Sequence, residues 1–443
     1  MDTRLQKFFL SMILLISALT VAFVFRGKSC TPDGLTVCFD AKKNAFKIED
    51  NAQLKILVPN AEYGQAVVAY WDWYHPEAIG KVTFELVTET AGSQDVLFVT
   101  QVQAGRLYDQ LYPLSPVLTK NVDLNKVTAL NLDHLTYIPL TAEGFSFLIN
   151  KTRLELLSLS LEDKNKDGLI DTVDTFEKII ELKALWDSLQ VEVLPIALNE
   201  PYSFYPYLTA GNFKIFEDYD ALIPGFDTPE FKQSLQLIQD LSKISWNQSE
   251  TNASETYTWK LDEVLVQDNF MFTVIGSWMG LNERDAAVQS EWIASKFPTY
   301  QGNELSPLVK TSGLAININT LYPSAAHELI RILKSIKGLQ LLIDYTDKIP
   351  LVNEETFPYL TFNDPHRSEL AFAYQYSVGE PIIAFAGNPE NLAIELYYNM
   401  DLMKIMRDLW DQKITIDEAQ SLVVAEATRV IEILNKSEDV VDE

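Results

Sequence analysis

The chain has 443 residues, which is enough for two or three packed domains, and 47% of them are hydrophobic. Its 35 lysines and arginines against 62 aspartates and glutamates give a net charge of −27, which argues against a nucleic-acid partner. Two cysteines and four histidines are too few for a zinc finger or a zinc ribbon.

The first predicted element is an apolar segment, Phe8–Phe25, of eighteen residues without a charge. Its length lies between the core of a signal peptide and a membrane-spanning helix. Thr20-Val21-Ala22 offers a cleavage site, but the apolar residues after it favour an uncleaved anchor, and Cys30 leaves lipidation open. We therefore expect residues 1–29 to be a membrane anchor or a signal peptide, and either one directs the chain out of the cytoplasm.

Cys30 and Cys38 are the only cysteines, and they flank a short segment of the extension at 30–53. In an oxidising compartment they would form a structural disulfide that closes a small loop. Two unpaired thiols are the alternative. A redox role is not indicated, because the Cys-x-x-Cys spacing is absent.

Strands and helices alternate along the rest of the chain. Short apolar runs predict strands at 54–58, 82–86 and 95–99. Helical periodicity predicts helices at 64–74, 105–111, 175–189, 229–244, 325–345, 392–410 and 416–434. This alternation indicates an α/β fold with mainly parallel sheets. Only Val87–Gln94 separates the second and third strands, which is too short for a helical crossover.

An acidic loop at 163–174 follows the spacing of calcium-binding loops, in which alternate oxygens converge and a glycine makes the sharp turn. A helix from Thr175 is expected to follow. The candidate ligands of a structural Ca²⁺ are Asp163, Asn165, Asp167, Leu169, Asp171 and Asp174. The alternative is an acidic turn and helix cap without metal.

Several short segments, taken in order, carry a resemblance to a known family. They are Asn199–Pro206, Asn269–Trp278, Phe297–Asn317, Ala325–Pro350 and Thr415–Ala419. Over about residues 54–435 the chain resembles the maltose/maltodextrin type of extracellular solute-binding protein, family 1 of the ABC-importer binding proteins.

The resemblance implies an α/β, two-lobe, periplasmic-binding-protein-like fold of type II, with the lobes joined by crossing strands. Lobe 1 would comprise 54–141 plus 312–347, and lobe 2 would comprise 142–311 plus 348–435. An acidic tail at 436–443 would follow. In such a fold a ligand closes the cleft between the lobes by a hinge motion.

By position in the motifs, the resemblance assigns ligand contact to Glu143, Glu200, Tyr202 and Trp278. Aromatic rings stack on the C–H faces of sugars, and carboxylates accept bonds from sugar hydroxyls. The family's charged pairs and one of its tryptophans are missing, and the nearest candidates are Asn60, Glu62, Gln101 and Tyr398. One half of the site therefore departs from the family. Core packing of the rings and solvated surface acids are the alternative reading.

These observations predict an extracytoplasmic solute-binding protein that captures an oligosaccharide, maltodextrin-like, for the permease subunits of an ABC importer. The alternative is a surface module of the same fold whose ligand site has degenerated, acting in sensing or in a structural role. An enzyme is not expected, because the sequence has no Gly-x-Ser-x-Gly elbow, phosphate loop or His-Glu-x-x-His motif.

Overall fold

The computed structural model describes residues 37–87, 93–119, 135–189, 192–213, 215–218, 223–244, 270–276, 290–352, 355–376, 380–381 and 392–438. The predicted N-terminal anchor or signal, Cys30 and most of the acidic tail lie outside these ranges. Within them, no helix is both long and apolar enough to cross a membrane.

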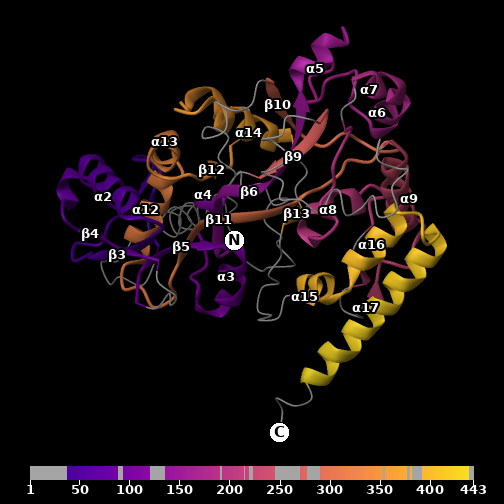
Figure 1. Ribbon diagram of the computed structural model, residues 1–443. Helices are drawn as coiled ribbons and strands as arrows, with labels where there is room; N and C mark the ends of the chain where they lie inside the picture. Colours follow the sequence, from indigo (N-terminus) through magenta and orange to yellow (C-terminus); the bar gives the residue numbers. More distant parts are fainter. Residues whose placement is uncertain are drawn as a thin grey trace, which may run out of the picture.

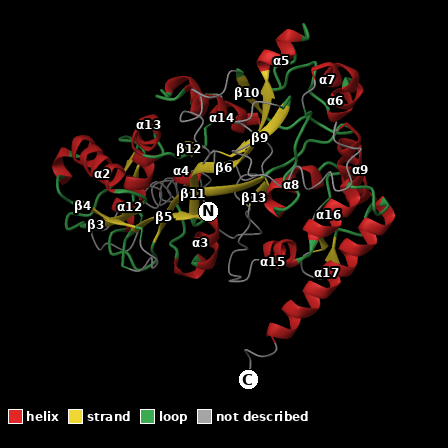
Figure 2. Ribbon diagram, viewed as in Figure 1, coloured by secondary structure: helices red, strands yellow, loops and turns green. Residues whose placement is uncertain are grey.

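The chain folds into a mixed α/β structure (Figures 1 and 2). Its strands are β1 (Phe39–Asp40), β2 (Ala45–Phe46), β3 (Leu54–Val58), β4 (Val82–Leu86), β5 (Val96–Thr100), β6 (Tyr137–Asn150), β7 (Phe216–Asp218), β8 (Ile223–Pro224), β9 (Phe272–Gly276), β10 (Trp292–Ser295), β11 (Leu308–Ile316), β12 (Ile349–Pro350) and β13 (Glu380–Pro381).

Helices cover the main sheet on its faces (Figure 2). They are α2 (Ala61–Tyr74), η1 (Pro76–Ala78), α3 (Gln101–Arg106), η2 (Tyr108–Gln110), α4 (Pro116–Thr119), α5 (Lys151–Leu156), α6 (Phe176–Glu181), α7 (Lys183–Leu189), α8 (Pro201–Leu208), α9 (Pro229–Ile244), α12 (Pro323–Leu333), α13 (Ile336–Tyr345), η4 (Phe357–Tyr359), α14 (Pro365–Tyr376), α15 (Leu392–Asn399), α16 (Leu402–Trp410) and α17 (Ile416–Glu438).

One large sheet runs through the molecule in the order β10-β6-β11-β5-β3-β4. The prediction of a mainly parallel sheet is wrong. Only the β3 pairs with β4 and β5, and the short β11–β13 pair, are parallel; the remaining pairs of this sheet, which centre on β6 and β11, are antiparallel. β3 lies between β4 and β5 and is parallel to both.

The long strand β6 belongs to two separate hydrophobic cores. Ile138 and Leu140 pack into the first core, whereas Phe145 and Phe147 pack into the second core. The pairing with β11 shifts register at Leu140, because Ser312 pairs with Thr141 whereas Gly313 pairs with Pro139. The two cores nevertheless share one face of the sheet, since Leu308 of the second core and Leu314 of the first core are six residues apart on β11 and alternate residues of a strand point to the same face.

The first core lies under α2, α12 and α13, which cover one face of β3, β4, β5 and the nearer ends of β6 and β11. Gly313 is required where β11 crosses β6, because a Cβ atom there would lie 1.9 Å from the carbonyl oxygen of Ile138. Any side chain would force the two strands apart.

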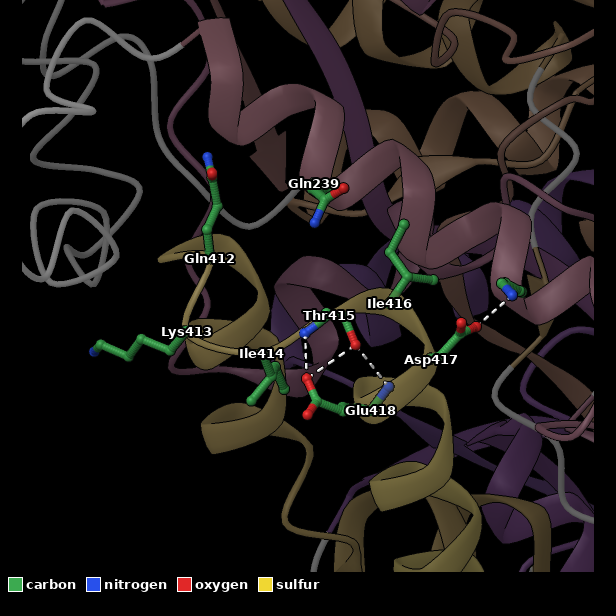
Figure 3. A pocket seen from close by; sticks show the side chains of 9 residues that line it. Gln239, Gln412, Lys413, Ile414, Thr415, Ile416, Asp417 and Glu418 are labelled. Carbon is green, nitrogen blue, oxygen red and sulfur yellow. Dashed lines mark hydrogen bonds and ion pairs between the residues drawn. The ribbon is translucent and has the colours of Figure 1, made fainter.

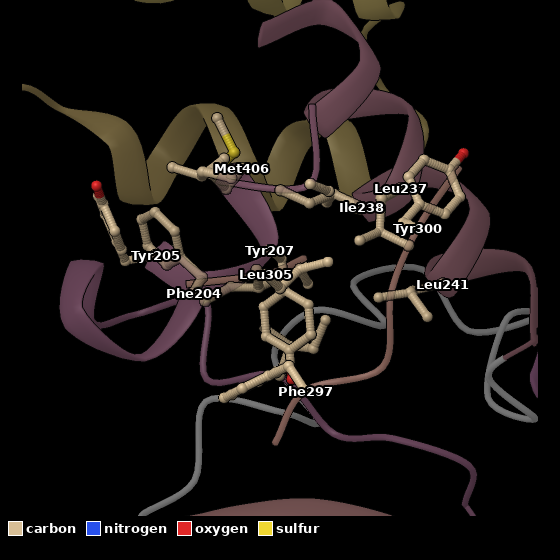
Figure 4. Close-up of a cluster of buried hydrophobic side chains, with 14 of the residues drawn as sticks. Phe204, Tyr205, Tyr207, Leu237, Ile238, Leu241, Phe297, Tyr300, Leu305 and Met406 are labelled. Carbon is tan, nitrogen blue, oxygen red and sulfur yellow. The ribbon is translucent and has the colours of Figure 1, made fainter. Parts of the chain in front are cut away.

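The second core is rich in aromatic residues from α8, α9 and the later strands (Figure 4). Phe204 and Tyr207 of α8 are fully buried, and Tyr207 packs edge to face on Phe297 at 6.0 Å between ring centroids. Such aromatic pairs add a favourable interaction to the area that they bury. Burial raises the pKa of the Tyr207 hydroxyl.

The extension before β3 is bound to the N-terminal half of α12. The Cys38 backbone N–H donates to Ser324 Oγ at 2.8 Å, and the Glu49 carboxylate accepts from the backbone N–H groups of Ser324 and Ala325, both at 2.8 Å. A carboxylate at this position satisfies donors that a helix N-terminus leaves unpaired. Cys38 is part of a disulfide bond. Since Cys30 lies outside the described residues, the pairing between the two remains a prediction.

Candidate functional site

The predicted contact Glu143 lies on the part of β6 that joins the two cores. Its carboxylate is half-buried and forms an ion pair with Lys348, which immediately precedes β12. Across the strands, Glu143 is the register partner of Lys310 on β11. The acid is therefore already neutralised by the protein, and a ligand hydroxyl would have to compete with an ammonium group for it.

Tyr202 packs inward from the first turn of α8. Only 8% of the residue is exposed, its ring lies 4.9 Å from that of Phe145, and its hydroxyl donates to the Leu308 carbonyl at 2.9 Å. On the side of β11, the Lys310 ammonium lies 5.8 Å from the ring centroid. Tyr202 thus joins α8 to β11 and is not a free stacking surface in this structure.

Glu200 and Tyr398 form the exposed part of the candidate site. Glu200 is exposed as the N-cap residue of α8, and its carboxylate accepts from Ser203 Oγ at 3.1 Å. Tyr398 on α15 is 40% exposed. Burial, and after it the nearby charge of Glu200, raises the pKa of Tyr398 to about 12, so the phenol stays protonated at neutral pH. A ring and an acid therefore lie together, as recognition of a sugar requires.

The α15 helix is held against α8 by its neighbouring tyrosine. The Tyr397 hydroxyl donates to the Pro201 carbonyl at 2.6 Å, and its ring packs edge to face on Tyr205 at 5.1 Å. This buried bond fixes the position from which Tyr398 faces Glu200.

Gln101 is buried at the start of α3, in a chain of polar contacts across the sheet. Its side-chain oxygen accepts from Thr311 Oγ1 at 3.0 Å, and the Thr311 oxygen lies 3.1 Å from the Tyr137 hydroxyl. Burial, as the largest cause, raises the pKa of Tyr137. Gln101 therefore connects α3 to β11 and β6.

Asn60 and Glu62 lie at the N-terminus of α2. Asn60 caps the helix by accepting from the Tyr63 backbone N–H at 2.8 Å, and its amide donates to the Tyr345 carbonyl at 2.9 Å. Glu62 is exposed in the first turn. Asn60 thus holds the end of α13, three residues before Lys348. Trp278, the remaining predicted contact, lies outside the described residues.

Two pockets in the described part lie away from this site. One, of about 520 Å³, is at the turn between α16 and α17, where Thr415 and Glu418 cap the last helix (Figure 3). The other, of about 420 Å³, lies between the acidic loop and α14, and Ser295 and Phe372 are among its lining residues. Neither is lined by a predicted sugar-contacting residue, whereas the second is lined by Asp163 and Leu169, two of the predicted Ca²⁺ ligands.

The acidic loop has the backbone of a tight turn. The Asp163 carboxylate accepts from the Asp167 and Gly168 backbone N–H groups at 3.2 and 3.0 Å, and Gly168 has a φ of 84°. The helix after the loop begins where expected, with Thr175 as the N-cap of α6. Lys178 binds Asp174 at 2.8 Å and would have to release it to a metal.

Within the described ranges, no group of three or more His, Cys, Asp or Glu side chains is arranged as a metal site. The side-chain oxygens of the loop are nevertheless the hard ligands that Ca²⁺ prefers. The proposed Ca²⁺ therefore stays a prediction.

Lys310 and Lys348 are the residues near the site that sequence reasoning did not single out. Their proximity to Glu143 depends on the strand register of β6 with β11 and β12, which no local pattern reveals. In the sequence, the available sign of Lys348 was that a lysine directly precedes the Ile349-Pro350 turn.

No family model matches this chain, and no curated protein matches it.

Proposed function

We propose that the chain is an extracytoplasmic solute-binding protein of two lobes, each built around one of the two hydrophobic cores. The observation that carries the proposal is the pair β6 and β11, whose residues enter both cores. Two halves joined by continuous strands can rotate about those strands and close on a ligand.

The proposed ligand is an oligosaccharide of the maltodextrin kind, delivered to the permease subunits of an ABC importer. Glu200 and Tyr398 support a sugar, because they pair an exposed carboxylate with a partly exposed ring. Glu143 would add a second acid at the strand crossing, if closure moves Lys348 away from it. Gln101 and Asn60 would act by holding the surrounding segments in place.

Isothermal titration of the full chain with maltodextrins and other oligosaccharides tests this proposal. We expect saturable binding that Glu200→Ala weakens about tenfold, the cost of one hydrogen bond to a charged group. Tyr398→Ala should weaken it similarly. The matched control is Tyr359→Ala, which removes a tyrosine ring on η4 that is more exposed, at 69%, than the ring of Tyr398. Binding that is unaffected by either site substitution would contradict the proposal.

One observation favours a second candidate, a surface module whose ligand site has degenerated. Glu143, Tyr202 and Gln101 all use their polar atoms within the protein. If no oligosaccharide binds at any concentration, and Glu143→Gln mainly lowers thermal stability, the degenerate module becomes the better account.

A structural Ca²⁺ in the loop at 163–174 accompanies both candidates. Asp163, Asn165, Asp167 and Asp171 would hold it together with the Leu169 carbonyl, and Asp174 would join after releasing Lys178. The role of the ion would be to stiffen the segment before α6.

A further inference from the structure

The C-terminal end of α2 and the residues just after it carry an exposed group of apolar side chains. Trp73 is 73% exposed, Tyr74 is 39% exposed and Ile79 is 65% exposed. The Trp73 ring stacks on that of Tyr70 at 5.9 Å and lies 6.2 Å from that of Tyr74. We call Trp73, Tyr74 and Ile79 the aromatic patch; Tyr70, on which the Trp73 ring stacks, is buried. An exposed group of this kind indicates an interaction surface.

A second feature, the basic hairpin, adjoins the aromatic patch. Lys42 and Lys43 lie in the turn between β1 and β2, Lys47 directly follows β2, and all three are exposed. The pKa of Glu77 is lowered chiefly by its own backbone N–H, next by His75, and also by the charge of Lys43. Glu77 lies two residues before Ile79, so the hairpin turn is close to the patch.

The net charge of the protein is −27, yet three of the six residues from Lys42 to Lys47 are lysines, and all three are exposed. Two of the neighbouring acids are engaged within the protein: Asp40 accepts from the Lys42 and Lys43 backbone N–H groups, and Glu49 accepts from the N-terminus of α12. Lysines that flank exposed tryptophan and tyrosine are the combination that suits the boundary between anionic lipid headgroups and hydrocarbon.

Buried bonds connect the hairpin to the aromatic patch. The Phe46 backbone N–H donates to Glu328 Oε2 at 2.7 Å, and Glu328 Oε1 lies 2.9 Å from His75 Nε2. His75 directly follows Tyr74. Arg331 binds the same carboxylate at 2.6 Å and donates to the Tyr74 hydroxyl at 3.0 Å. The hairpin and the patch are therefore held on one side of α12 as a single surface.

The chain enters the described structure beside this surface. Cys38 is bound to Ser324, seven residues before Arg331 on α12, which is about 10 Å along a helix. Eleven residues lie between the apolar segment Phe8–Phe25 and Val37, and such a connection spans at most about 40 Å. Where that segment is embedded in a bilayer, the surface is thus confined to within a short distance of the same bilayer.

We propose that the aromatic patch and the basic hairpin form a membrane-facing surface that lies on the headgroup region of a bilayer containing anionic lipid. Trp73, Tyr74 and Ile79 enter the boundary between headgroups and hydrocarbon, where an amphipathic ring has one apolar and one hydrated side. The three lysines approach the lipid phosphates. The surface thereby sets which side of the first core faces the membrane.

The test uses the full chain reconstituted into vesicles of phosphatidylcholine and phosphatidylglycerol, with or without bromine in the acyl chains. Brominated chains quench a tryptophan only when it enters the bilayer boundary. The difference in fluorescence between the wild type and Trp73→Ala isolates the emission of Trp73 from that of the other tryptophans. We expect this difference signal to be quenched in the brominated vesicles.

Reversal of charge at the basic hairpin sharpens the test. One lysine near an anionic membrane surface favours the membrane-bound state about fivefold. The triple change of Lys42, Lys43 and Lys47 to Glu should therefore lower the membrane-contacting fraction more than about tenfold. The matched control changes to Glu three exposed lysines that lie on the side of the second core, Lys243, Lys404 and Lys413. This control should leave the quenching unchanged. High salt should act in the same direction as the hairpin variant.

Two results would overturn the proposal. Trp73 emission that is equally bright in brominated and unbrominated vesicles would place the patch away from lipid and leave a protein partner as its occupant. Quenching that persists in the hairpin variant and in pure phosphatidylcholine would contradict the proposal that the lysines bind anionic headgroups. Trp73 and the lysines are exposed, so circular dichroism should show that all variants fold.

Discussion

The two cores of this protein bury different chemistry beneath one sheet. The first core is bordered by a charged network in which Glu328 is completely buried and binds His75, Arg331 and a backbone N–H. The second core is filled by aromatic rings that pack edge to face. Dispersion and hydrophobic burial therefore dominate one half, whereas the other half also depends on ionised groups that must keep their partners. Shortening buried side chains and changing the pH should therefore lower the stability of the two halves by different amounts.

The largest expected effect comes from matched tryptophans, one in each core. Trp71 and Trp186 are both fully buried, and each indole N–H donates to a carbonyl seven residues away. Each change to Ala should cost about 3–5 kcal/mol. Calorimetry should show that Trp71→Ala lowers the unfolding transition of the first core and Trp186→Ala that of the second. Trp73→Ala is the exposed control. A single transition that both variants lower equally would mean that the cores unfold as one unit.

The next effect concerns the charged network. Glu328→Gln leaves Arg331 without its counter-charge in a buried site and leaves His75 with only Glu77, so we expect a loss of about 3 kcal/mol in chemical denaturation. The control is Glu304→Gln in the second half, which removes the partly exposed pair with Lys296 and should cost less than about 1 kcal/mol. Equal losses in the two variants would show that the buried network has no special role.

A bound Ca²⁺ should stabilise the second core and not the first, by less than the substitutions above change the stability. If the loop at 163–174 holds Ca²⁺, a hundredfold excess of ion over its dissociation constant stabilises the folded state by about 2.7 kcal/mol. Addition of a chelator should then lower the transition of the second core and leave that of the first unchanged. Asp167→Asn should reduce the response, whereas Asp187→Asn, in an exposed ion pair with Lys183, should not. Unchanged melting after chelation would reject the site.

The smallest expected effect is a pH dependence of the first core. Burial is the largest influence on His75 and lowers its pKa, but the bonds to Glu328 and Glu77 outweigh it, so the pKa is raised. Protonation therefore stabilises the folded form. That stability is complete below the unfolded-state pKa of about 6.5 and is lost as the pH rises through the folded-state pKa.

A comparison of wild type with His75→Asn isolates this contribution, because the buried His327, whose pKa is lowered mainly by burial, titrates in the opposite sense. The melting temperature of the first core should fall between pH 6 and 8 in the wild type and stay flatter in the variant. Identical profiles for the two proteins would contradict the assignment.

Much of the fold could be predicted where a local pattern was strong. The strands at 54–58 and 82–86 and the helix at 229–244 are confirmed to the residue, since short apolar runs and helical periodicity are read directly from sequence. The helix expected at 105–111 is wrong in position. It begins at Gln101, because Thr100 and Gln103 form a capping box that the periodicity did not reveal. The helix expected at 325–345 divides where Ser335 caps α13.

The candidate site was less accessible to prediction, because it depends on contacts between distant segments. The sequence singled out Glu143 but not Lys348, which lies 205 positions later and meets it only through strand pairing. Tyr202 was chosen as a contact by its position in a motif of the resembled family, and Asn60 as the nearest candidate for a charged pair that the chain lacks. In the structure one is a core ring and the other a helix cap, and nothing in their neighbouring residues distinguishes these roles.

The path of the chain through β6 has a consequence for how the protein is made. The first core needs α12 and α13, which are synthesised only after most of the second half, so β3 and α2 must wait for a cover that arrives hundreds of residues later. Contacts of such long sequence separation slow folding and prolong the exposure of apolar surface. This order of assembly suits a polypeptide that folds after its synthesis is complete.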